Sequence, residues 1–266
     1  MQTHPAPAAR ETGLLTIQAI GGPTAILELG GIRLLTDPTF DPPGEYDLGG
    51  RVLTKTQPAA LSPSEVGRID VVLLSHDQHF DNLDRRGRAF LDETSCVLTT
   101  RSAAARLAGT IPLATWDYRD FPRPDGGHLR VTAVPAQHGP DGTEHIVGEV
   151  TGFVLSGSGL PNVYVSGDNA SLRVVARVVE RFPTIDVAIL FAGGARTPLL
   201  GDAYLTLNSD MAAAAARMLS CRWVVPVHFN SWQHFTEGAD DLRSAFARAG
   251  LDDRLILLSP GERDWI

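Results

Sequence analysis

Short apolar runs of strand length recur along this chain, and each is ended by glycine, proline or a charged residue. Near the start, "LLTIQAIGG", "TAILELGG" and "IRLLTDPTF" follow one another with only tight-turn residues between them. Runs spaced in this way predict antiparallel strands that are neighbours in a sheet. The pattern therefore predicts a β-rich fold that opens as a meander over residues 14–40.

Strand patterns alternate with amphipathic helical patterns in the second half. Strands are predicted at residues 161–167, 185–192 and 222–227, and helices at 170–182, 209–220 and 240–250. A sheet with helices on one face must bury its other face, and a second sheet can cover it. We expect an α/β protein with four layers, an αβ/βα sandwich. With no convincing linker, residues 14–266 are predicted to form a single domain behind a flexible N-terminal arm, residues 1–13.

Residues 41–68, "DPPGEYDLGGRVLTKTQPAALSPSEVGR", interrupt this regular order. The segment is rich in proline and glycine and shows no steady periodicity. Such segments run over the surface and often carry or border binding sites. We predict a long surface excursion here that helps to wall a pocket.

Charge and hydropathy exclude several classes of function. The chain of 266 residues has a formal net charge of −8, which opposes binding to the phosphate backbone of nucleic acids. It contains no run of eighteen apolar residues and no secretory signal pattern. We therefore expect a cytoplasmic protein with a small-molecule substrate, no nucleic acid and no membrane among its partners, and self-association into a homo-oligomer left open.

Polar clusters stand at the ends of apolar strand patterns, where loops from a shared sheet edge point into one crevice. The residues that share this position are Asp37, the stretch Ser75–Asp84, His138, Asp168 and His228. Histidine and aspartate are common ligands of divalent metals in enzymes. Their repetition at successive strand ends predicts a metal site.

The order of these residues resembles the metallo-β-lactamase superfamily, whose signature is a His-x-His-x-Asp-His loop followed by a lone His, a bridging Asp and a final His. The segments "LLTDPTF", "LLSHDQHFDNLD", "YVSGDN" and "VPVHF" are most similar to the branch that contains ascorbate-6-phosphate lactonase. The resemblance covers nearly all of the chain after residue 13. It implies the αβ/βα sandwich, with one or two divalent metal ions between the sheets, zinc first and manganese or iron as alternatives.

The spacing of the signature loop departs from the family pattern, because His76 and His79 have two residues between them instead of one. If the strand end sets the register, His76 and His79 are the ligands and one residue is inserted. If the loop is counted back from Asp81, Asp77 takes the place of the first histidine. The match of "LLSH" to the strand end favours His76.

A second departure is Asn82, which stands where the family usually has histidine. The resemblance otherwise implies that His138 completes the first metal position, that Asp168 bridges, and that Asp81 and His228 belong to the second position. A neutral amide oxygen suits harder cations better than it suits zinc. Asn82 therefore puts the second ion in question, and a dinuclear site with an unusual second half is our first expectation, before a single ion.

The chemistry expected from such a site is hydrolysis by a metal-activated water. Asp81 is predicted both to bind metal and to orient this water, and His234 to donate a proton to the leaving group or to bind an oxyanion. Asp37 either fixes a ligating imidazole or forms a turn before Pro38. We expect a hydrolase acting on a small-molecule ester, lactone or phosphoester. The alternative is a metal-binding or regulatory protein of the same fold with weak or lost catalysis.

Overall fold

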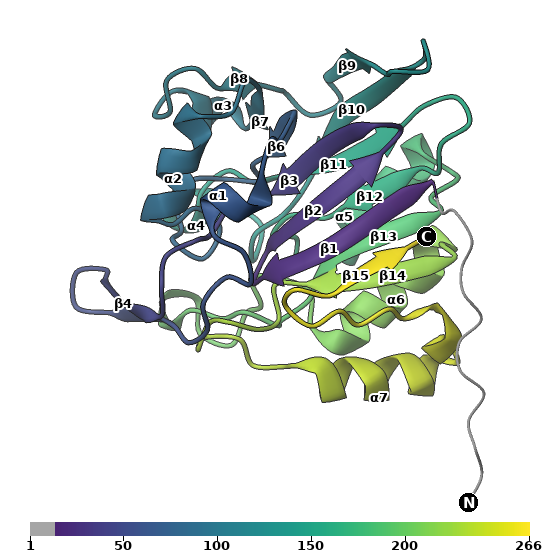
Figure 1. The fold of residues 1–266 in the computed structure, drawn as a ribbon. Coiled ribbons are helices and arrows are strands. Elements are labelled where there is room, and N and C mark those ends of the chain that lie inside the picture. Colours follow the sequence, from purple (N-terminus) through teal and green to yellow (C-terminus); the bar gives the residue numbers. More distant parts are fainter. Residues whose placement is uncertain (1–13) are drawn as a thin grey trace, which may run out of the picture.

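The computed structural model describes residues 14–266, so the arm predicted for residues 1–13 lies outside the described residues. Two β-sheets lie face to face, with helices on their outer sides (Figure 1). The first sheet has the strand order β15 (Arg263–Trp265), β1 (Leu15–Gly21), β2 (Thr24–Leu29), β3 (Ile32–Thr36), β6 (Val71–Leu73), β7 (Val97–Thr99) and β8 (Ile111–Pro112). The second has the order β14 (Trp223–Val227), β13 (Val187–Phe191), β12 (Val163–Val165), β11 (Thr151–Ser156), β10 (His128–Pro135) and β9 (Tyr118–Pro122).

The predicted opening meander is confirmed. Strands β1, β2 and β3 pair antiparallel, with Ile17 opposite Leu27 and Leu27 opposite Leu34. These three residues are buried on the face that meets the second sheet. From β3 onward the first sheet continues through β6, β7 and β8 in parallel, and β12, β13 and β14 are parallel in the second sheet.

Four layers result, as the sequence predicted. Apolar side chains of both sheets, such as Ile17 and Phe153, form one core between them. A second core lies between the first sheet and the helices α1 (Pro63–Val66), α2 (Arg85–Asp92) and α3 (Arg101–Ala104). A third lies between the second sheet and the helices α5 (Leu172–Arg181), α6 (Ser209–Leu219) and α7 (Ala239–Ala249). Among residues 14–266, none of the helices has the length and apolar character that a membrane span requires.

The segment 41–68 is more regular than its composition predicts. It forms a hairpin of β4 (Gly44–Asp47) and β5 (Val52–Lys55), which stands out from the body of the molecule in Figure 1, and then the short helix α1. The hairpin turn contains Gly49 and Gly50 at φ 71° and 91°, values that glycine adopts without steric cost. This Gly-Gly pair between two short runs was the signal for a hairpin.

Sequence analysis also missed β9 and β15, which lie at the edges of the two sheets, and the short helix α4 (Glu144–Val147). Strand β15 has the sequence Arg-Asp-Trp and shows no apolar alternation. It forms because β1 offers an open edge, with Thr16 opposite Trp265. Pairing at a sheet edge depends on a distant partner, which a local pattern cannot reveal.

Candidate metal centre and active site

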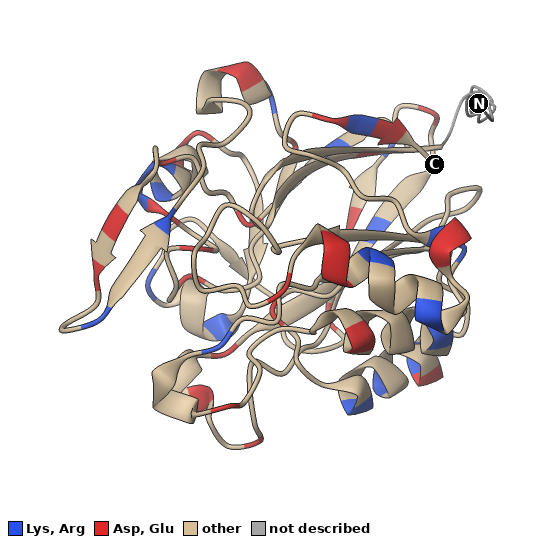
Figure 2. Ribbon diagram, turned by 90° about the horizontal axis from the view of Figure 1, so that it is seen from below, with Lys and Arg blue, Asp and Glu red and all other residues tan. Residues whose placement is uncertain are grey.

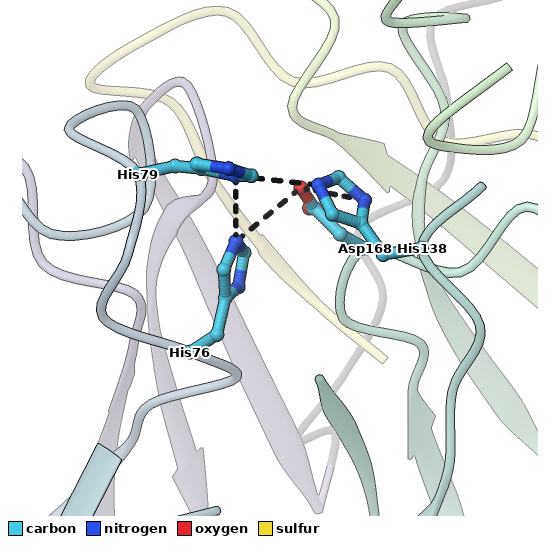
Figure 3. A group of neighbouring side chains, drawn as sticks. All are labelled: His76, His79, His138 and Asp168. Atoms are coloured by element: carbon cyan, nitrogen blue, oxygen red, sulfur yellow. Dashed lines mark hydrogen bonds and ion pairs between the residues drawn. The ribbon is translucent and has the colours of Figure 1, made fainter. Parts of the chain in front are cut away.

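Three histidines and one aspartate meet where strands of both sheets end. His76 and His79 follow β6, His138 follows β10 and Asp168 follows β12 (Figure 3). One ligand atom from each lies within 4.8 Å of the corresponding atoms of the other three. Nδ1 of His79 is 3.1 Å from Nε2 of His76 and 3.2 Å from Nε2 of His138. Ligands that bind zinc at about 2.0–2.1 Å in a tetrahedron are separated by about 3.3 Å, so this spacing fits a shared ion.

The structure places His76, and not Asp77, in this group. The carboxylate of Asp77 is bonded instead to Arg106, with its Oδ2 3.0 Å from Nε and its Oδ1 2.5 Å from Nη2. Arg88 also approaches Asp77 at 3.8 Å. The strand-end register is therefore the one that brings the histidines together, with Asp77 and Gln78 both standing between His76 and His79.

Neighbouring groups hold two of the imidazoles in the tautomer that leaves Nε2 free to bind a cation. Ser75 donates through its backbone N–H and its hydroxyl to the carboxylate of Asp37, both at 2.6 Å. The Ser75 hydroxyl therefore accepts from Nδ1 of His76 at 2.9 Å. Nδ1 of His138 donates to the carbonyl of Leu205 at 2.8 Å. Such contacts orient histidine ligands in metal sites.

Asp37 reaches the imidazole of His76 through Ser75, whereas the sequence left open either a direct contact with a ligating imidazole or a turn before Pro38. It also accepts from the amide of Asn82 at 3.0 Å. Asp37 itself has φ 24°, in a region that non-glycine residues seldom occupy and that is found at functional sites. Ser75, directly before His76, was in the quoted motif but was not identified as an orienting residue.

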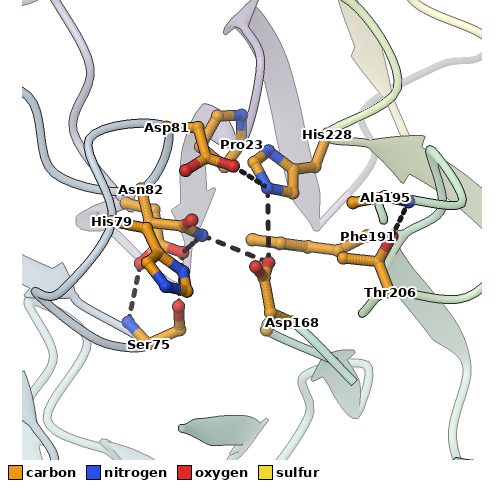
Figure 4. Close-up of polar contacts among 12 residues, drawn as sticks. Pro23, Ser75, His79, Asp81, Asn82, Asp168, Phe191, Ala195, Thr206 and His228 are labelled. Carbon is orange, nitrogen blue, oxygen red and sulfur yellow. Dashed lines mark hydrogen bonds and ion pairs between the residues drawn. The ribbon is translucent and has the colours of Figure 1, made fainter. Parts of the chain in front are cut away.

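A second set of side chains lies beside the first (Figure 4). Nε2 of His228 is 3.4 Å from Oδ2 of Asp81 and 3.4 Å from Oδ1 of Asp168. Nε2 of His234 is 3.0 Å from the same Oδ2 of Asp81. Asp168 therefore faces both sets, with Oδ2 toward the first and Oδ1 toward the second. In the described part of the chain, the first set alone has all its ligand atoms within 4.8 Å of one another.

Unsatisfied buried atoms in the second set fit a cation. His228 is fully buried, and neither of its ring nitrogens makes a hydrogen bond of normal geometry within residues 14–266. The amide oxygen of Asn82 is likewise buried without a donor. Groups of this kind are rare in folded proteins because desolvation without a partner costs free energy. A divalent cation would supply the missing partner.

Histidine pKa values are shifted in opposite directions in the two sets. Burial, together with the neighbouring His138, lowers the pKa of His79 to about 4, and burial lowers the pKa of His76 as well. Burial also opposes the charged form of His228, but the carboxylates of Asp168 and Asp81 outweigh it and raise the pKa of His228 to about 10. His76 and His79 are thus held in the neutral form that binds metal, and the second set contains an imidazole that lies close to two carboxylates.

Backbone geometry fixes the ends of two strands at this edge. His228 has φ 58°, and its backbone N–H donates to the carbonyl of Gly22 in the first sheet at 2.7 Å. Gly167 precedes Asp168 at φ 57°, and a Cβ there would lie 2.5 Å from the carbonyl oxygen of Thr151. Only glycine fits at this position, so Asp168 is presented from a turn that no other residue can form without a backbone shift.

A cavity of about 360 Å³ opens above the metal-binding side chains. The hairpin contributes Arg51, Val52 and Leu53 to its wall, which agrees with the predicted role of residues 41–68. The remaining lining includes Phe80, the segment 195–198 and His234. The side chain of His234 is 21% exposed, so it can meet a bound molecule. The cavity is mostly apolar around a polar floor, as in small-molecule sites.

Similarity to known proteins shows the family of this chain. The sequence model of the β-lactamase superfamily domain matches residues 32–229. The chain belongs to the β-lactamase superfamily. A protein from Thermococcus onnurineus named UPF0173 metal-dependent hydrolase is 24% identical over 241 residues, covering 91% of this chain and 95% of that protein. A protein of the same name from Anaeromyxobacter dehalogenans is 28% identical over 215 residues, 74% of each chain.

Solved structures carry the same fold. An isothiocyanate hydrolase from Delia radicum gut bacteria superposes with a TM-score of 0.81 at 20% identity, over 94% of this chain and 98% of that one. A metallo hydrolase from Ignicoccus hospitalis gives 0.68 at 19% identity, over 94% and 97%. The predicted metallo-β-lactamase fold is thereby confirmed, and this superfamily member is a metal-dependent hydrolase with a His/Asp cluster that can bind metal.

Proposed function

We propose that the protein hydrolyses a small-molecule ester, lactone or phosphoester at the floor of its cavity. The observation that carries this proposal is the convergence of His76, His79, His138 and Asp168 beneath an open pocket of about 360 Å³. A divalent metal bound there would lower the pKa of a water ligand to about 7 and so supply hydroxide at neutral pH.

The side chains around the cluster have separate tasks in this proposal. Asp81 faces the cavity floor with its Oδ2 between His228 and His234, where it can hold and orient the attacking water. His234 lies in the cavity wall. It is the residue placed to protonate a leaving group or to bind the oxyanion that develops on the substrate.

Zinc is the metal proposed for the first set, because three imidazoles are a known donor set for catalytic zinc and leave a position for water, while Asp168 would be shared with the second set. Two features support a small substrate. The cavity is of the size that small molecules fill, and the net charge of −8 opposes nucleic acid. Figure 2 shows acidic and basic residues mixed over the helices in that view, without a continuous basic stripe. A cytoplasmic location is part of the same proposal.

Within the superfamily, a lactonase related to ascorbate-6-phosphate lactonase remains our first assignment, on the motif resemblance alone. The structural neighbour named isothiocyanate hydrolase adds isothiocyanates to the compounds worth testing. The competing proposal is a protein that binds metal but has weak or lost catalysis, favoured by Asn82 at a position where histidine is usual.

Metal analysis combined with a substrate panel tests the proposal. The full-length protein would be assayed on lactones, carboxylic esters, phosphoesters and isothiocyanates, as purified, after chelation and after zinc is returned. Hydrolysis of one class that is lost on chelation and restored by zinc is the expected result. Bound metal without turnover of any class would favour the regulatory alternative, and protein that takes up no metal would overturn both.

A further inference from the structure

We propose that Asn82 contributes its amide oxygen to a second, oxygen-rich cation position. The preference for zinc over manganese is much smaller at this position than at the histidine-rich first position. The other donors are Asp81, Asp168 and His228. This inference rests on the proposed metal-dependent function, but it concerns the second ion and not the substrate. Its basis is the direction in which the Asn82 amide must point.

Two carboxylates decide the orientation of that amide. One terminal atom of Asn82 lies 3.0 Å from Oδ2 of Asp37 and 3.2 Å from Oδ1 of Asp168. Oδ2 of Asp37 already accepts from the hydroxyl of Ser75, and the carboxylate of Asp168, which faces the imidazole of His228, is ionised and only accepts. The atom facing both carboxylates must therefore be the nitrogen, because an oxygen there would meet two acceptors.

The amide oxygen is left without a partner as a consequence. Asn82 is fully buried, and its Oδ1 has no donor among the described residues. In Figure 4 the Asn82 amide stands in the group formed by Asp81, His228 and Asp168. An unpartnered acceptor in a buried site is costly. A cation removes the cost, and it would also bind Nε2 of His228, which lies 3.4 Å from two carboxylates without a hydrogen bond of normal geometry in the described residues.

The donor atoms of the two positions differ in chemical type. The first position has three imidazole nitrogens, from His76, His79 and His138, and one carboxylate oxygen. The second would have two carboxylate oxygens, one amide oxygen and the single imidazole of His228. Imidazole suits zinc, whereas carboxylate and carbonyl oxygens suit manganese. Most divalent sites bind zinc more tightly than manganese, so the expected signature is a smaller preference for zinc at the second position.

Electron paramagnetic resonance of Mn²⁺ provides a readout that does not depend on activity. The full-length protein is stripped of metal, given one equivalent of zinc and titrated with Mn²⁺, whose free signal disappears on binding. Wild type is expected to bind one equivalent of Mn²⁺. Competition with zinc then gives the ratio of the dissociation constants for Mn²⁺ and Zn²⁺ at the second position. This ratio is compared with the same ratio measured at the first position.

Substitutions of Asn82 distinguish the loss of a metal-binding oxygen from the loss of the folded structure. Asn82→Ala is expected to weaken Mn²⁺ binding by at least about tenfold. Asn82→Asp keeps an oxygen donor and should retain Mn²⁺, whereas Asn82→His should raise the preference for zinc by about tenfold or more. Asn162→Ala is the matched control, because Asn162 precedes β12 at the end opposite Asp168, and within residues 14–266 its side chain bonds only the backbone carbonyl of Thr184.

Three results would overturn the inference. They are no Mn²⁺ binding after the first zinc, an unchanged Mn²⁺ affinity in Asn82→Ala, and an equal preference for zinc in wild type and Asn82→His. The comparison of zinc preference between wild type and Asn82→His tests the inference even if Asn82→Ala fails to fold. If wild type that binds no Mn²⁺ after the first zinc still hydrolyses its substrate, the second position is refuted and the proposed function stands.

Discussion

Nζ of Lys55 lies 2.9 Å from Oδ2 of Asp84, and both side chains are shielded from solvent. Lys55 ends strand β5 of the hairpin, and Asp84 caps helix α2 by accepting from the backbone N–H of Gly87 at 2.8 Å. Asp84 also accepts from the backbone N–H of Asp41 at 2.6 Å. The pair fastens the hairpin wall of the cavity to the end of the loop that carries the metal-binding side chains.

Replacing Lys55 by alanine is expected to lower the free energy of unfolding by about 3–5 kcal/mol, because the Asp84 carboxylate would remain buried without its countercharge. Urea denaturation measures the loss. Arg130→Ala is the control, since its ion pair with Asp120 is exposed to water that screens it. Equal losses in the two variants would mean that the buried pair does not anchor the hairpin.

Removing the imidazole of His138 should abolish the first metal position. His138→Ala is expected to reduce bound zinc and to lower kcat/KM by at least about a hundredfold, because the activated water depends on that ion. Zinc content by plasma mass spectrometry and the hydrolysis rate are measured together. His145→Ala serves as the control, since this exposed histidine bonds only the carbonyl of Gly142. A full complement of zinc in His138→Ala would contradict the site.

Ser75 is predicted to affect zinc affinity only by orienting the imidazole of His76. In Ser75→Ala, Nδ1 of His76 loses its acceptor and the imidazole is no longer held in one tautomer. Zinc affinity should fall by about 10–100-fold. Competition with a fluorescent chelator measures the change, and thermal unfolding of the metal-free variant checks that the fold is intact. Unaltered affinity would show that Ser75 and Asp37 do not orient the ligand.

The metal-free protein should lose stability as the pH falls from 6.5 to about 4. Burial lowers the pKa of both His76 and His79 below the ordinary histidine value of 6.5, that of His79 to about 4. Over this range the unfolded chain binds protons at both histidines and the folded chain does not, so unfolding is favoured by acid. Asp37 acts in the opposite direction, because burial raises its pKa to about 7. His228, whose pKa is raised to about 10, also opposes the loss near pH 6.5. Asp81 and Asp168 add to the loss toward pH 4, because neighbouring histidines lower the pKa of both carboxyl groups against the effect of burial.

Denaturant midpoints of the metal-free protein across this pH range measure the effect. His79→Gln should show a shallower slope, because one of the two histidines that cause it is gone. A midpoint that stays level or rises on acidification would contradict the assigned direction.

Two buried tyrosines give a contrasting pair. The hydroxyl of Tyr164 on β12 has no partner among residues 14–266, whereas Tyr46 donates to Asp41 at 2.9 Å. Tyr164→Phe is expected to leave stability unchanged or raise it by up to about 1 kcal/mol, and Tyr46→Phe to lower it by about 1–3 kcal/mol. Thermal unfolding of the two variants tests this order. A marked loss of stability in Tyr164→Phe would show that the hydroxyl of Tyr164 has a hydrogen-bond partner.

Local pattern predicted most of the architecture. The strands that carry Asp37, Asp168 and His228 were identified because each is an apolar run ended by a polar residue. The helices α5, α6 and α7 were identified by their period. The hairpin β4–β5 was missed since its short strands are mostly exposed, and an exposed strand carries little apolar signal.

The sequence by itself determined which side chains stand at strand ends, because strand and helix periodicity is written in local order. Only the tertiary structure decided between His76 and Asp77, since that choice depends on the ion pair between Asp77 and Arg106, which lies just after helix α3. The same holds for Ser75 beneath His76, for Lys55 against Asp84 and for the direction of the Asn82 amide. Each is a contact between segments far apart in the chain or a choice of side-chain orientation, and neither leaves a trace in local residue order.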